Sequence, residues 1–328
     1  MTTAMGPGPE FDRIRAIAQA LGARGAGLGD DCAVIPDGDG HLVISTDASV
    51  GGIHFRRAWL TLTEIGWRAA AGALSDLAAM GARPVGLLAA IAVPKGAAPD
   101  ETVELMGGIG EAAEASGTIV IGGDLSAASE WMVTVTVIGR AERPVRRAGA
   151  AAGDELWVTG ALGAARAALL AWESGADPAP AARAAFARPV ARIEAGVWLA
   201  EHGATAMLDL SDGLAADAHH LAAASKVRLE IDLTRIPTAG AAVPAALERA
   251  VEPPLLAAQG GEDFELLASL PASFGEAGQR AFEAHTGVAL TRIGTVQRGS
   301  GVRLLLRGER VSLEGFDHFR AEGAGGER

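Results

Sequence analysis

Short acidic segments recur at the ends of apolar runs in this chain, and they constrain its fold more than any other feature. Each combines Asp or Glu with Gly, Ser or Thr: Gly29-Asp30-Asp31, Ser45-Thr46-Asp47, Ser75-Asp76, Gly122-Gly123-Asp124, Asp209-Leu210-Ser211-Asp212 and Gly260-Gly261-Glu262-Asp263. Carboxylates held close together repel one another and take up protons unless a hard cation such as Mg²⁺ lies among them. The pattern therefore indicates a fold that gathers these segments around metal ions, and such ions indicate phosphates.

The composition indicates a two-domain protein and excludes several classes of partner. A chain of 328 residues exceeds what one hydrophobic core usually organises. The formal net charge of −12 argues against nucleic acid, because affinity for its backbone comes from clustered Lys and Arg. No apolar run is long enough to span a membrane, and the first residues lack the apolar core of a secretory signal, so we expect a cytoplasmic enzyme. The single cysteine, Cys32, excludes an intramolecular disulfide and a Cys-based zinc site.

The apolar pattern alternates between strands and helices, which predicts an α/β (α+β) fold. In the first half we expect strands at 41–45, 85–93, 117–121 and 131–139 and helices at 10–21, 63–82 and 100–116. In the second half we expect strands at 155–159, 206–210, 227–233, 264–270, 290–296 and 302–306 and helices from 164 and at 181–202 and 213–225. The polar stretch 140–154 separates the two patterns. It predicts an N-terminal domain of residues 1–145 and a C-terminal domain of residues 146–328.

Asp76 is the strongest single candidate for a metal ligand. It lies in an apolar helix, where a carboxylate is costly to bury without a partner. Any one of the other acidic segments, taken by itself, is more often a purely structural turn than a ligand site. The chain has neither GxxxxGK[ST] nor a complete GxGxxG, so any nucleotide must bind in another way. It also lacks a GxSxG motif, which argues against a serine nucleophile.

Taken together, the motifs resemble those of the thiamine-monophosphate kinase family. The match runs from residue 9 to residue 319 and rests on GPEFDRIRAIA, GLGDDCAVI, STDASVGGIHF, LSDLAAMGARP, VIGGDLS, RRAGAAAGDELWVTG, LDLSDGLAADAHHLAAAS, GGEDFELL and GFDHF. Several of these are shared with a wider superfamily of aminoimidazole ribonucleotide synthetase, selenophosphate synthetase and hydrogenase maturation proteins. The combination of GIHF, LSDLAAMGA, LDLSDGLA, GGEDFELL and GFDHF favours the kinase branch.

The resemblance implies a two-domain aminoimidazole ribonucleotide synthetase-like fold, with N-terminal strands that join those of a partner in a homodimer. It implies transfer of the γ-phosphoryl group of ATP to thiamine monophosphate with Mg²⁺, the last step of thiamine diphosphate biosynthesis. The implied Mg²⁺ ligands are Asp30, Ser45, Thr46, Asp47, Asp76, Asp124, Asp209 and Asp212. The implied nucleotide contacts are Gly123, Asp124, Arg147 and Ser211, the substrate contacts are His54, Glu262 and Phe316, and the catalytic residues are Asp47, Asp124, Arg147 and Asp212.

The chain departs from the family pattern at a few positions and leaves two alternatives open. The departures are Leu125-Ser126 where two Thr are usual, Gly51 where an acidic residue is common, the stretch Arg68 to Ala73, and the lack of an aromatic residue near Met106. One alternative is a sister enzyme that uses ATP on another acceptor, although the cysteine that selenophosphate synthesis or hydrogenase maturation requires is missing. The other is an inactive metal- or nucleotide-binding dimer, which is expected to have lost motif carboxylates.

Overall fold

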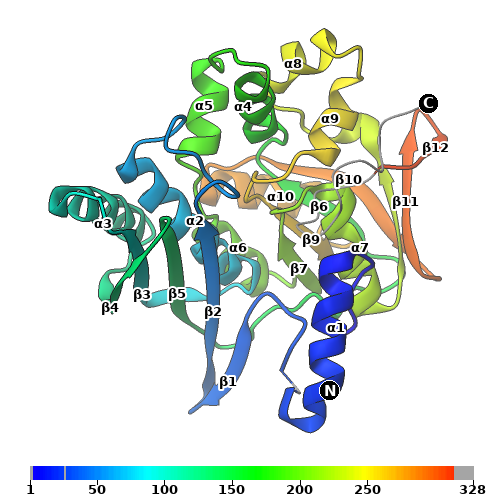
Figure 1. The fold of residues 1–328 in the computed structure, drawn as a ribbon. Helices are drawn as coiled ribbons and strands as arrows, with labels where there is room; N and C mark the ends of the chain where they lie inside the picture. The colour runs from blue at the N-terminus through cyan, green and yellow to red at the C-terminus, as the bar shows by residue number, and fades with distance from the viewer. Residues whose placement is uncertain (1–2, 26, 314–328) are drawn as a thin grey trace.

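A computed structural model describes residues 3–25 and 27–313. It contains two mixed α/β layers, each built on one sheet, and Figure 1 shows the two sheets side by side with helices between and around them. The predicted substrate contact Phe316 and the GFDHF motif lie outside the described residues. None of the helices within 3–25 and 27–313 is long and apolar enough to cross a membrane.

The first sheet has five strands, and two long helices cover one of its faces (Figure 1). The strands are β1 (Ala33–Asp37), β2 (Gly40–Val50), β3 (Arg83–Pro94), β4 (Val120–Ala128) and β5 (Met132–Ala141), in the order β1-β2-β5-β3-β4. The covering helices are α2 (Leu62–Ala79) and α3 (Pro99–Ala115). Only β3 and β4 run parallel; the other pairs are antiparallel. Helix α1 (Pro9–Leu21), followed by the 3₁₀ turn η1 (Gly22–Gly25), precedes this sheet.

The second sheet has seven strands and is almost entirely antiparallel. Its strands are β6 (Glu155–Thr159), β7 (Ala206–Asp209), β8 (Arg228–Asp232), β9 (Leu266–Leu270), β10 (Leu290–Gln297), β11 (Gly301–Leu306) and β12 (Glu309–Val311), in the order β12-β11-β8-β10-β6-β9-β7. The helices of this half are α4 (Ala164–Glu173), α5 (Pro180–Ala187), α6 (Ile193–Glu201), α7 (Leu214–Ser225), α8 (Ala242–Glu248), α9 (Pro253–Gln259) and α10 (Gly275–Thr286), with a 3₁₀ turn η2 at Leu233–Arg235.

One apolar core continues through both halves. Helix α2 is buried along nearly its whole length, and its residues share a cluster with α6, α10 and one face of the second sheet. The opposite face of that sheet packs on α7 and α9 in a second cluster. Alternate residues of a strand point to opposite faces, so Met207 belongs to the first cluster and Leu208 to the second. The same alternation directs Asp209 toward α2.

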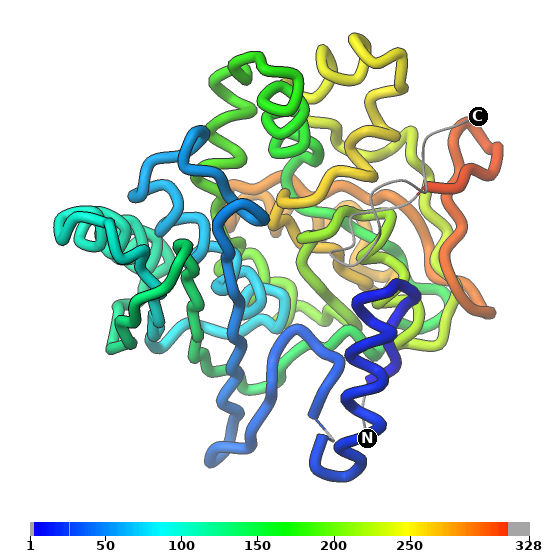
Figure 2. Tube along the Cα trace, in the orientation of Figure 1, coloured from blue at the N-terminus to red at the C-terminus, as the bar shows by residue number. Residues whose placement is uncertain are grey.

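The chain crosses from one sheet to the other between β5 and β6 (Figure 2). The predicted boundary between residues 145 and 146 falls in this crossing and stays a prediction.

Three predicted elements differ clearly from the structure, two of them through pairing with strands remote in the sequence and one through a proline. Strand β2 does not end at Ser45 but continues to Val50, since residues 45–50 pair with β5. The strand expected at 117–121 begins at Val120, runs to Ala128 and is an exposed edge strand rather than a buried one. The helix expected at 181–202 is two helices, α5 and α6, because the break between them contains Pro189, which has no N–H to donate.

Candidate functional site

Three aspartates from three separate elements form the centre of the site. Asp31 precedes β1, Asp76 lies in α2 and Asp209 ends β7, and a carboxylate oxygen of each lies within 4.8 Å of the others. Burial, followed by the charges of Asp209 and Asp31, raises the pKa of Asp76 well above its ordinary value. Burial and the neighbouring Asp31 also raise the pKa of Asp209 to about 7. The negative charges of the three aspartates are therefore not fully neutralised by neighbouring cationic side chains.

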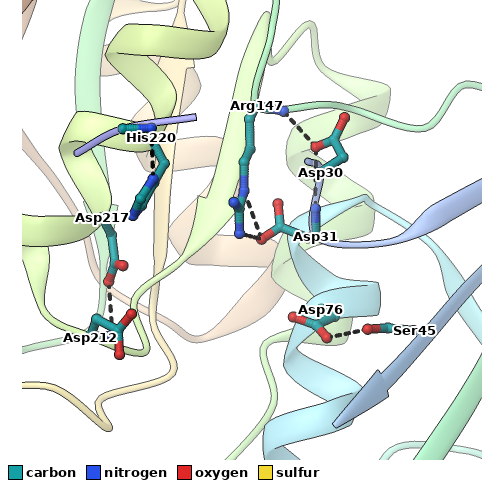
Figure 3. Close-up of polar contacts among 9 residues, drawn as sticks. Asp30, Asp31, Ser45, Asp76, Arg147, Asp212, Asp217 and His220 are labelled. Carbon is teal, nitrogen blue, oxygen red and sulfur yellow. Dashed lines mark hydrogen bonds and ion pairs between the residues drawn. The ribbon is translucent and has the colours of Figure 1, made fainter. Parts of the chain in front are cut away.

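Arg147 supplies positive charge on one side of this cluster (Figure 3). Its side chain donates to Asp31 Oδ1 from Nε at 3.1 Å and from Nη2 at 2.6 Å, and its backbone N–H donates to Asp30 Oδ1 at 3.0 Å. Burial raises the pKa of Asp31 even though Arg147 opposes this rise. Among the described residues, Asp31 Oδ2 is buried and has no hydrogen-bond partner. A hard oxygen donor set with an unpartnered buried oxygen fits a divalent cation such as Mg²⁺.

Strand β2 presents the next predicted ligands on two different faces. Ser45 and Asp47 share the face that points toward α2, and Ser45 Oγ donates to Asp76 Oδ2 at 2.5 Å (Figure 3). Asp47 is exposed, and its Oδ1 accepts from the N–H of Ala48 at 2.8 Å. Thr46 points to the opposite face, where its hydroxyl lies 3.0 Å from that of Thr136. The Thr46 side chain is thus directed away from the aspartate cluster.

The loop after β7 carries Ser211 and Asp212 and is held in shape by α7. Asp217, in the first turn of α7, accepts from the N–H group of Asp212 at 3.1 Å (Figure 3) and from that of Gly213 at 3.0 Å. Burial, together with Glu10 and Glu262, raises the pKa of Asp212 to about 7. Asp212 is therefore a further carboxylate, outside the cluster of three, whose charge a cation would stabilise.

Two adjoining cavities lie beside these residues. The smaller cavity, about 200 Å³, is lined by Glu10, Asp47, Ser49, His54, Arg68, Gly72, Ser211, Asp212, Glu262 and Phe264 and is called here the acidic cavity. The larger cavity, about 460 Å³, has aromatic, aliphatic and charged walls that include Trp59, Leu169, Leu170 and Phe186. Both cavities share His54, Ser211 and Glu262. A molecule in the larger cavity can therefore extend one end toward the carboxylates.

The comparisons with known proteins agree with this arrangement. Residues 29–141 match the family model AIR synthase related protein, N-terminal domain, and residues 151–307 match AIR synthase related protein, C-terminal domain. A thiamine-monophosphate kinase of Mycobacterium tuberculosis is 36% identical over 74% of this chain and 74% of its own length. That of Halobacterium salinarum is 35% identical over 93% of this chain and 99% of its own length. The chain belongs to the thiamine-monophosphate kinase family.

Solved structures of the same kind have the same two-layer fold. The structure of AaThiL complexed with AMPPCP and TMP is 30% identical, covers 94% of this chain and 97% of its own, and superimposes with a TM-score of 0.85. Thiamine-monophosphate kinase from Stenotrophomonas maltophilia gives 33% identity and a TM-score of 0.76, covering 94% of this chain and 98% of its own. The predicted family and fold class are therefore confirmed, and the protein is an enzyme, a kinase.

Not all predicted site residues of this kinase meet within one chain. Asp124 lies in the middle of β4, in register with Ala90 of β3, and through β3 and β5 with Ala48 of β2. It is thus three strands, roughly 14 Å, from β2. It also points to the face opposite Asp47, since neighbouring strand residues alternate. Gly123 lies on the same exposed edge strand. The predicted roles of Asp124 and Gly123 stay predictions, as does that of Phe316.

The structure adds two residues that the sequence reasoning did not select. Asp31 belongs to the aspartate cluster, whereas its neighbour Asp30 is bonded to the backbone of Arg147 and lies 3.4 Å from Arg146 Nη1. The only signal for Asp31 was its adjacency to Asp30. Arg68 lines the acidic cavity and forms an ion pair with Glu262. The signal for Arg68 was a charge in an apolar helix, the same argument that selected Asp76.

Proposed function

We propose that this enzyme transfers the γ-phosphoryl group of ATP to thiamine monophosphate, giving ADP and thiamine diphosphate, as the Mg²⁺-dependent last step of thiamine diphosphate synthesis in the cytoplasm. The observation that carries the proposal is the shared wall of the two cavities. It lets an organic ring occupy the larger cavity while its phosphate faces Asp47 and Asp212. The related AaThiL structure holds AMPPCP and TMP, which agrees with one nucleotide and one phosphorylated acceptor.

Carboxylates from both halves would hold the Mg²⁺ ions. Asp31 joins the residues predicted from the sequence, which are the carboxylates Asp30, Asp47, Asp76, Asp124, Asp209 and Asp212 and the hydroxyl residues Ser45 and Thr46, of which Thr46 has its side chain on the opposite face of β2. The chemistry that bound Mg²⁺ supplies is charge neutralisation on the β- and γ-phosphate oxygens. The residues themselves fix where the two anionic substrates meet, and the raised pKa values of Asp76, Asp209 and Asp212 are consistent with binding sites for cations.

The transfer needs no strong general base from the chain. A phosphate monoester has a second pKa near 6, so at neutral pH the acceptor oxygen is already largely deprotonated. This oxygen forms the new bond to the γ-phosphorus while the bond from that phosphorus to the β–γ bridging oxygen breaks, and ADP leaves with the electron pair. Arg147 would add fixed positive charge beside the nucleotide, with Gly123 and Ser211 as further contacts. His54, Glu262 and Phe316 would contact thiamine monophosphate.

The proposal includes a homodimer in which β4 of one subunit approaches β2 of the other. In the described chain β4 is an edge strand with exposed Ile121 and Leu125, 50% and 64% accessible. Strand β1 pairs only with residues 40–44 of β2, so the Ser45–Val50 segment has an open edge as well. Open strand edges favour pairing with another chain. Such pairing would bring β4 of the partner subunit, which carries Asp124, alongside the segment of β2 that carries Asp47.

The direct test is turnover of thiamine monophosphate with ATP and Mg²⁺. We expect thiamine diphosphate and ADP in equal amounts from the wild-type enzyme. We expect Asp47→Asn to lower kcat by roughly a hundredfold or more, because an amide cannot replace the charge of a carboxylate ligand. The exposed turn variant Asp39→Asn is the matched control and should behave as wild type. ATP binding without diphosphate formation would disprove the proposed reaction, and near-normal turnover by Asp47→Asn would remove Asp47 from the site.

A further inference from the structure

Arg68 is a buried arginine that joins three parts of the fold. It lies in α2, and only 6% of its side chain is accessible. Nη1 donates to the carbonyl oxygen of Phe186, near the end of α5, at 2.8 Å, and the guanidinium carbon lies 3.8 Å from the centroid of the Phe186 ring. Nη2 forms an ion pair with Glu262 in the loop before β9. The two contacts with Phe186 therefore fix the orientation of the Arg68 guanidinium independently of its ion pair with Glu262.

Glu262 is held in an unusual position by this arginine and by its own backbone. Its φ is +72°, in the left-handed region that non-glycine residues seldom adopt. Its N–H donates to the carbonyl oxygen of Ser211 at 2.7 Å. Its side chain is 28% accessible and lines both cavities at their shared wall. The planar guanidinium of Arg68 fixes where the carboxylate points, since a guanidinium directs its donors rigidly.

We infer that Arg68 is a positioning residue that acts through Glu262 and thereby sets recognition of the ring portion of the acceptor. The acceptor class that fits is a cationic, amino-bearing heteroaromatic molecule, for which a fixed carboxylate supplies both charge and a hydrogen-bond acceptor. The inference rests on the proposed function, in which Glu262 contacts thiamine monophosphate. It goes further because it assigns the orientation of the Glu262 carboxylate to Arg68 of α2, a helix of the other half of the molecule.

Arg68 also lines the acidic cavity, so a direct contact with the acceptor phosphate is the competing interpretation. The two interpretations predict different effects of an Arg68 substitution on the binding of thiamine and of thiamine monophosphate. If Arg68 acts through Glu262, loss of the arginine weakens thiamine, which has no phosphate, and thiamine monophosphate by the same factor. If Arg68 contacts the phosphate, only thiamine monophosphate is weakened. Thiamine is therefore the informative probe.

The test compares Arg68→Met, Arg68→Lys, Glu262→Gln and the double variant Arg68→Met/Glu262→Gln in the full-length enzyme. We expect Arg68→Met to raise KM for thiamine monophosphate and Kd for thiamine roughly tenfold, with kcat and KM for ATP within about twofold of wild type. Arg68→Lys should recover part of the loss, because it keeps the charge without the planar fork. The double variant should bind no more weakly than Glu262→Gln alone, because the two residues act as a unit.

The matched control is Arg183→Met, which breaks another ion pair between α5 and α2. Its partner is Glu64, and neither residue lines either cavity. Additive losses in the double variant, or a loss confined to thiamine monophosphate, would overturn the inference. If Arg68→Met fails to fold, which the absence of a cooperative thermal transition would show, the same comparison is made with Arg68→Lys and Glu262→Gln. Calorimetric binding of thiamine needs no turnover, so a failure of the proposed reaction is distinguishable from a failure of this inference.

Discussion

At the scale of single residues, the aspartate cluster links protonation to metal binding. In the folded chain Asp209 has a pKa of about 7, against an ordinary value of 3.8. Between these two pH values the folded protein binds a proton at this position that the unfolded chain has lost. Without metal, the free energy of unfolding therefore falls as the pH rises through this window. A cation that binds only the ionised, folded cluster reverses this loss above pH 7.

We therefore expect Mg²⁺ to raise the Tm of the wild-type enzyme more at pH 8 than at pH 5.5, measured against EDTA. In EDTA, Asp209→Asn should be more stable than wild type at pH 8, by about 4 °C or more, because the amide removes a buried repulsion. At pH 5.5 the two proteins should approach the same Tm, since the wild-type residue is then protonated. In Mg²⁺ the variant should lose its advantage. A Mg²⁺ effect equal at both pH values would contradict this account.

The sequence can single out a candidate site residue when a charged side chain stands in an apolar helix, because burying such a charge without a partner is costly. Asp76 follows from the cost of a carboxylate in an apolar helix, and the structure places it in the cluster. The same reasoning applies to Arg68, whose partner Glu262 lies far away in the sequence and so leaves no local signal. Which member of the pair Asp30-Asp31 points toward Asp76 depends on the path of the chain into β1, and no spacing rule determines it.

At the scale of elements, glycines set how closely α2 and α3 approach each other. A Cβ added to Gly66 of α2 would lie 2.0 Å from the carbonyl oxygen of Leu105, and one added to Gly108 of α3 would lie 1.8 Å from that of Thr63. Backbone atoms cannot withdraw from such contacts without moving a whole helix. The close contact explains how a chain with few aromatic residues forms a dense core from small side chains.

Neighbouring glycines of α3 provide a prediction with an internal control. We expect Gly108→Ala to lower the free energy of unfolding by about 2 kcal/mol or more, because overpacking forces the helices apart. Gly107→Ala, whose added Cβ meets no atom within 4 Å, should raise it by roughly 0.5–1 kcal/mol through helix propensity. Chemical denaturation of both variants gives the comparison. Equal effects would show that α2 and α3 are not packed as closely as described.

Element boundaries were predicted less well than element types, for a reason that β2 and β4 illustrate. The segments 45–47 and 122–124 contain Gly, Ser, Thr and Asp, which favour turns, yet both lie inside strands. Their pairing partners, β5 and β3, are remote in sequence, and pairing overrides the local preference. The positions of the acidic segments are thus determined by strand pairing as well as by turns.

At the scale of the whole molecule, the position of Asp124 bears on how the active site is completed. Within one chain it lies across the sheet from Asp47 and on the opposite face. The proposed homodimer would remove the separation across the sheet, because the open edge of β4 in one subunit would lie beside the open edge of β2 in the other and bring each Asp124 close to its partner's site. A shared site of this kind makes activity depend on both chains at once.

Subunit mixing tests this directly. Asp47→Asn and Asp124→Asn should each be nearly inactive as purified homodimers. After the two are unfolded and refolded together at equal concentration, about a quarter of wild-type activity should return, because half of the dimers are mixed and one of their two sites contains both native aspartates. Asp39→Asn mixed with Asp124→Asn should instead recover about half of wild-type activity, since every intact Asp124 serves one site. Sedimentation should give a dimer in all cases. No recovery in the first mixture would place Asp124 in the site of its own subunit.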